Sequence, residues 1–120
     1  MHTTFRTALL PLAIAAIALI ASAGAALAHP PIDIVASNWK FTPAKISIPV
    51  NEETTLRLTS SAGVHGIEST DLGIPKTTIT PDKFVTVTFT PKKAGTYVIH
   101  CAVICGPGHG DMTLTVEVTP

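Results

Sequence analysis

Hydrophobic and polar residues alternate along several short segments of this chain. Leucines alternate with polar side chains between residues 54 and 60, and valines and a phenylalanine alternate with threonines between residues 85 and 89. A period of two places one set of side chains on the core face of a β-strand and the other in water. The run from Leu114 to Val118 repeats the alternation, so Met112 lies on the inward side if this strand begins there.

No helical period follows residue 28, and short runs rich in Ile, Val, Thr and Phe are separated there by Pro, Gly and Asn. Tight turns are expected where Pro fixes φ and where Gly or Asn tolerates positive φ, at residues 49–52, 80–82 and 91–95. This pattern predicts one all-β domain, a Greek-key β-sandwich. The predicted strands are residues 32–37, 45–49, 54–60, 64–69, 83–90, 95–101 and 112–118.

The N-terminal 28 residues differ from the rest. Arg6 precedes an almost wholly apolar stretch, residues 8–26, and Ala26-Leu27-Ala28 has the small-x-small form of a signal-peptidase site. We therefore expect residues 1–28 to be a signal peptide and residues 29–120 to be the mature domain. The alternative is an uncleaved membrane anchor over residues 8–28, a stretch long enough to span about 30 Å of hydrocarbon. Either interpretation predicts export to the periplasm or an equivalent compartment.

The charges of the chain are balanced. Eight Lys and Arg residues face eight Asp and Glu residues, and no basic run is present. This composition gives no reason to expect a nucleic-acid partner. A domain of this size has a limited core, so a metal or a disulfide is expected to contribute to its stability.

The candidate chemistry is concentrated in one stretch, Cys101-Ala-Val-Ile-Cys105-Gly-Pro-Gly-His109-Gly-Asp-Met112. It contains two thiols, one imidazole and one thioether. A thioether suits copper and is a poor ligand for hard cations or zinc. The interleaved glycines and proline allow a tight loop in which several side chains converge. The stretch therefore predicts a copper site.

Two other uses of the cysteines stay open. A structural disulfide between Cys101 and Cys105 is common chemistry for exported proteins, but it leaves His109 and Met112 without a role. Zinc accepts two Cys and two His in a closed tetrahedral site, but it leaves the thioether unused.

A copper site needs one more imidazole, and His65 is the best candidate. It stands in Val64-His65-Gly66, about 40 residues upstream, and strands distant in sequence become neighbours in a sandwich. His100 is adjacent to Cys101 and is expected to point to the opposite face of its strand. His29 would begin the mature chain and chelate copper through its amine and imidazole, a weaker hypothesis because Pro30 removes the next amide donor. Trp39 is expected in the core.

The pattern Cys-x3-Cys-x3-His-x2-Met with an upstream Val-His-Gly resembles the CuA domain of cytochrome c oxidase subunit II, and similar domains end nitrous oxide reductases. The resemblance runs from Trp39-Lys-Phe-Thr-Pro43 to Val118. It implies a cupredoxin-like fold and an electron-transfer protein, which is not itself an enzyme. It also implies two copper ions per chain. The implied metal ligands are the bridging thiolates of Cys101 and Cys105, the terminal imidazoles of His65 and His109, and two weak axial donors, Met112 and the backbone carbonyl of Val103.

The resemblance implies a redox partner such as a c-type cytochrome or a terminal oxidase. Many subunit II sequences carry an acid between the cysteines where this chain has Val103, so a further metal held by that acid is not expected. Two alternatives remain. One is a mononuclear copper centre of His65, Cys105, His109 and Met112, with Cys101 unused. The other is copper delivery or buffering by the same soft ligands.

Overall fold

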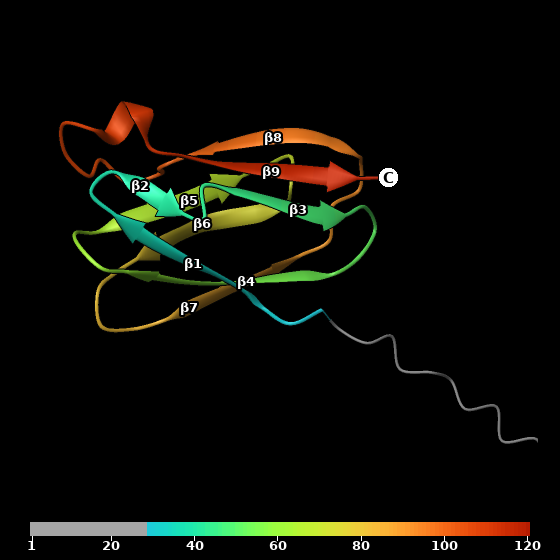
Figure 1. Cartoon of the computed structure of the whole chain (residues 1–120), viewed down its shortest axis with the longest axis horizontal. Coiled ribbons are helices and arrows are strands. Elements are labelled where there is room, and N and C mark those ends of the chain that lie inside the picture. Colours follow the sequence, from blue (N-terminus) through green and yellow to red (C-terminus); the bar gives the residue numbers. More distant parts are fainter. Residues whose placement is uncertain (1–28) are drawn as a thin grey trace, which may run out of the picture.

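The structure is a computed structural model that describes residues 29–120, and the predicted signal peptide or anchor lies outside the described residues. The described chain folds into β-strands with a single turn of 3-10 helix, η1 (Figure 1). The elements are β1 (Ile32–Ser37), β2 (Lys40–Thr42), β3 (Lys45–Pro49), β4 (Thr54–Ser60), β5 (His65–Ser69), β6 (Ile74–Ile79), β7 (Val85–Phe89), β8 (Gly95–His100), η1 (His109–Asp111) and β9 (Thr113–Thr119).

The strands form two main sheets and a smaller one. One sheet has the order β2-β1-β4-β7, the other has the order β3-β9-β8, and β5 pairs with β6. The β5–β6 pair contacts β8 of one sheet and β7 of the other, so it lies along one side of the sandwich. β1 runs parallel to β4 and β3 runs parallel to β9, while the remaining pairs are antiparallel. The predicted all-β sandwich is confirmed.

The core follows the alternation of the sequence. Leu56 and Leu58 on β4 are fully buried, whereas Arg57 between them is exposed. β9 begins at Thr113, one residue later than predicted, and Met112 directly before it is fully buried, as Leu114 is. Apolar burial of this kind stabilises a domain by roughly 25 cal/mol per Å² of surface removed from water.

Two strands were not predicted. β2 is only three residues long, and β6 contains Pro75 and Lys76, which interrupt the apolar run. Proline is tolerated at the margin of a sheet because the missing N–H removes no central hydrogen bond. β6 pairs only with β5, so it is such a strand among the described residues.

The loops at one end of the sandwich position the candidate site. Figure 1 shows the β1–β2 turn, the β4–β5 loop and the loop from β8 to η1 at the end opposite the C-terminus. Within residues 29–120, the structure contains no helix with the length and apolarity needed to cross a bilayer.

Candidate metal centre

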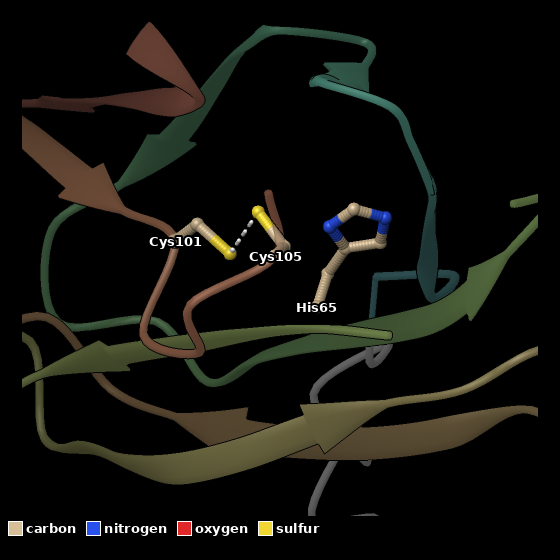
Figure 2. Close-up of side chains that lie close together, drawn as sticks. All are labelled: His65, Cys101 and Cys105. Carbon is tan, nitrogen blue, oxygen red and sulfur yellow. Dashed lines mark hydrogen bonds between the residues drawn. The ribbon is translucent and has the colours of Figure 1, made fainter. Parts of the chain in front are cut away.

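The two cysteines lie beside each other as free thiols. Cys101, directly after β8, is buried, and Cys105 is partly buried. Their sulfur atoms are 3.5 Å apart (Figure 2). The backbone carbonyl of Val103 folds back toward them and lies 3.1 Å from the sulfur of Cys101. The loop thus brings two soft sulfur donors and one carbonyl oxygen together.

His65 joins this group from the start of β5. One ligand atom each from His65, Cys101 and Cys105 all lie within 4.8 Å of one another. The Nε2 atom of His65 pairs with the carbonyl of Ala62 at 2.7 Å. Figure 2 shows the other ring nitrogen, Nδ1, on the side of the thiols. Nδ1 is the one buried side-chain polar atom in the described part of the chain without a hydrogen-bond partner.

His109 and Met112 complete the group from the other end of the loop. The Nδ1 atom of His109, at the start of η1, is 3.6 Å from the sulfur of Cys105. The thioether sulfur of Met112 is 3.8 Å from the same sulfur atom. Cys105 is therefore the centre of the cluster, with contacts to a second thiol, an imidazole and a thioether.

Backbone contacts hold the loop against the sheets. The amide of Cys101 donates to the carbonyl of Met112 at 3.1 Å, and the amide of Ala102 donates to the carbonyl of Gly66 at 2.9 Å. A Cβ atom on Gly66 would lie 2.8 Å from the side chain of Val103, so this close approach of β5 and the loop requires glycine. Gly66, the residue after His65, therefore allows the cysteine loop to pack closely against β5.

The protein environment keeps the Cys105 thiol protonated. Burial, the hydrogen bond with Cys101 and the charge of a Cys101 thiolate, in that order of size, together raise the pKa of Cys105 from 9.0 to about 11. Two adjacent thiols disfavour a pair of negative charges unless a cation neutralises them. Thiolates are the forms that bind metals, so a metal at this position would displace the proton.

The structure corrects one prediction and confirms another. Trp39 is 38% exposed and not in the core, because its indole lies over the glycines of the cysteine loop. Its Nε1–H donates to the carbonyl of Cys105 at 2.8 Å, a contact that was not predicted from the sequence. His100 is exposed, as expected from its opposite orientation to Cys101. His29 pairs with the carboxylate of Glu52, and its use as a copper ligand stays a prediction.

The donor set fits copper. An unpartnered buried imidazole nitrogen faces two reduced thiols, and a buried thioether lies 3.8 Å from the sulfur of Cys105. This combination of sulfur and imidazole donors matches the preferences of copper, and the thioether distinguishes it from a closed zinc site.

Comparisons with known proteins agree with the fold. Residues 10–115 match the family model described as the cupredoxin-like domain. The chain is 31% identical over 87 residues to cytochrome c oxidase subunit 2 of Thermus thermophilus. The matched segment covers 71% of this chain and 62% of that protein. The chain thus spans less than two thirds of that relative's length.

Two solved structures share the architecture. The periplasmic domain of subunit II of cytochrome oxidase from Bradyrhizobium japonicum superimposes with a TM-score of 0.69 at 18% identity, covering 77% of this chain and 85% of that chain. A chain of a heme-copper terminal oxidase dimer gives a TM-score of 0.66 at 25% identity and covers 78% of this chain and 68% of its own. The first likeness shows the fold alone.

Proposed function

The chain belongs to the cupredoxin-like domain family, and we propose that it is an exported electron-transfer protein with a dinuclear copper centre like that of cytochrome c oxidase subunit II. Its similarity to a subunit 2 over 71% of the chain supports this proposal. The donor set at the end of the sandwich supports it independently, because those donors are the ones that copper prefers.

The position of Cys101 is the observation that carries the dinuclear assignment. Its sulfur lies 3.5 Å from that of Cys105 and 3.1 Å from the carbonyl of Val103, and its side chain is 4% exposed. A mononuclear centre would use Cys105 and leave a second reduced thiol buried against the metal. Two adjacent thiolates with two imidazoles beside them offer places for two ions.

The assignment of ligands follows from these contacts. Cys101 and Cys105 are proposed to bridge the two ions. His65 and His109, which reach the sulfur pair from β5 and from η1, are proposed to bind one ion each. Met112 and the carbonyl of Val103 are proposed as the weak axial donors, since each lies beside one of the two sulfurs.

The proposed centre would supply one-electron redox chemistry with little change in bond length, because two thiolates share the charge over two metals. The chain's own contribution is a rigid frame. Cys101, Met112 and His65 are all buried, so water is excluded from most of the donor set and the polar atoms are held by backbone contacts. Fixed polar groups in a site without water minimise rearrangement when charge arrives or leaves.

We further propose that the domain works outside the cytoplasm and exchanges electrons with another redox protein, such as a c-type cytochrome or a terminal oxidase. The predicted signal peptide supports the location, and the names of the relatives support the partner class. Copper delivery is the alternative from a different class. It predicts tight Cu(I) binding without a reversible redox couple.

A pair of matched variants tests the dinuclear assignment. Cys101→Ser and Cys105→Ser each remove one sulfur and add almost no volume. A bridged pair of ions requires both thiolates, so either change should abolish the two-copper centre and its spectrum. The mononuclear alternative predicts asymmetry, with Cys105→Ser losing the copper chromophore and Cys101→Ser keeping it. Retention of the wild-type copper content and spectrum in Cys101→Ser would refute the bridging role of Cys101.

A further inference from the structure

The β1–β2 turn lies between the two segments that carry the proposed ligands. Asn38 and Trp39 form this turn, and neither contributes a donor to the cluster. Figure 1 shows the turn at the same end of the sandwich as the β4–β5 loop and the loop that leads to η1. The two side chains contact different loops.

Trp39 contacts the cysteine loop. Its Nε1–H donates to the carbonyl of Cys105 at 2.8 Å. A Cβ atom on Gly106 would lie 3.0 Å from the indole, and one on Gly108 would lie 2.6 Å from it. The loop backbone therefore packs directly on the ring, and the two glycines are the residues that permit it.

Asn38 contacts the β4–β5 loop, which leads directly to His65. A Cβ atom on Gly63 would lie 2.7 Å from the Oδ1 atom of Asn38, and Gly63 has a φ of +76°, which favours glycine. Gly63 follows Ala62, whose carbonyl pairs with the Nε2 atom of His65 at 2.7 Å. The contact thus lies one residue from the group that orients the imidazole.

We propose that Asn38 and Trp39 are positioning residues that hold the two ligand loops in their final arrangement before copper binds. This inference rests on the proposed metal centre. A loop with glycines at positions 106, 108 and 110 has high conformational freedom, and ordering it costs free energy at the moment of binding. The packing of Trp39 orders the loop in the copper-free protein, so copper binding does not include the free-energy cost of ordering it.

The same packing should slow the loss of copper. Release requires Cys105 and His109 to move away from the buried cysteine and His65, and Trp39 covers the segment that must move. The ring is 38% exposed and touches the loop from outside, so its removal should loosen the loop and leave the hydrophobic core in place.

Amide hydrogen exchange of the reduced, copper-free domain tests the proposal directly. The amides of His109 and Asp111 donate within the loop, to the carbonyls of Gly106 and Gly108, and report its opening. Trp39→Leu removes the ring, and Trp39→Phe keeps a ring and removes the N–H donor. Phe84→Leu is the matched control, because Phe84 is an aromatic residue of 55% exposure whose ring contacts the Arg57 guanidinium and not the cysteine loop.

We expect exchange at these loop amides to be at least about tenfold faster in Trp39→Leu and less strongly accelerated in Trp39→Phe. Phe84→Leu should match the wild type at these positions. The copper-loaded variants should release copper to a chelator in the same order. Loop exchange in Trp39→Leu equal to that of the wild type would overturn the proposal, and so would uniform acceleration throughout the domain, which would make Trp39 a general stabiliser.

The result of the hydrogen-exchange experiment does not depend on whether the dinuclear assignment is correct. Exchange is measured without copper, so it decides the positioning role whether the loaded protein holds one ion or two. A variant that keeps two coppers with wild-type release and exchange would refute the positioning role and leave the dinuclear centre standing.

Discussion

The raised pKa of Cys105 gives a quantitative prediction for the copper-free protein. Burial is the largest cause, followed by the hydrogen bond with Cys101 and the charge of its thiolate, and together they raise the pKa from 9.0 to about 11. At pH 7 a thiol with the ordinary pKa of 9.0 is about one part in 100 thiolate. With a pKa of about 11 the thiolate fraction falls to about one part in 10,000. Alkylation of Cys105 at neutral pH should be slowed about 100-fold by this effect.

The pH profile of alkylation separates this effect from simple steric protection. The reduced, copper-free domain would be labelled under argon between pH 7 and 12, and tandem mass spectrometry would assign the label to one cysteine. The rate at Cys105 should rise about tenfold per pH unit beyond pH 9 and level off near 11, whereas the urea-unfolded chain should level off near 9. A folded-state plateau at pH 9 would refute the reasoning. In Cys101→Ser the midpoint should fall but stay above 9, because burial remains.

The same shift makes the copper-free fold sensitive to alkali. The folded pKa is raised, so the protonated thiol contributes stability that is complete below pH 9 and is lost as pH rises from 9 toward 11. The slope is at most about 1.4 kcal/mol per pH unit, and partial solvent exposure of the sulfur reduces it. Urea unfolding at pH 8 and pH 10.5 measures this loss. Equal midpoints at the two pH values would contradict the direction.

Three further predictions concern the frame and the ligands. Gly66→Ala brings a Cβ within 2.8 Å of a loop side chain and should destabilise the fold by about 1–3 kcal/mol in urea unfolding; Gly110→Ala, where a Cβ meets nothing within 4 Å, should not. An equal effect of both would contradict the close packing of β5 on the loop. Met112→Leu nearly conserves volume and should fold, but loss of the thioether should raise the reduction potential in voltammetry; an unchanged potential would exclude an axial role. His109→Ala should change the electron paramagnetic resonance spectrum and His100→Ala, at an exposed position, should not; the reverse result would exchange their roles.

The alternation of apolar residues was sufficient to predict most of the sandwich. β1, β3 and β4 have the predicted bounds, and Asn51 and Asp82 adopt positive φ within predicted turns. β6 was missed because Pro75 and Lys76 interrupt the alternation of apolar and polar residues. A proline is tolerated in a strand at the margin of a sheet. Such a strand is defined by its partner β5, and local sequence does not contain that information.

The sequence was sufficient to predict the candidate ligands of the site, but not the residues that hold the ligand loop in place. The cysteine loop and His65 were predicted as one cluster, and the structure brings one ligand atom each of His65, Cys101 and Cys105 within 4.8 Å of one another. The role of Trp39 was not predicted, because a lone tryptophan is usually buried and nothing local links it to a loop 66 positions away. The glycines at 106 and 108 were the available signal, since a backbone without Cβ atoms accepts a ring at close range.

The most direct test of the central claim is the copper content of the purified, copper-loaded domain, measured together with its optical and electron paramagnetic resonance spectra. The account predicts two coppers per chain, a purple chromophore and one unpaired electron shared by both nuclei. One copper per chain with hyperfine splitting from a single nucleus would contradict the dinuclear centre, and a colourless Cu(I) protein without a reversible redox couple would contradict electron transfer.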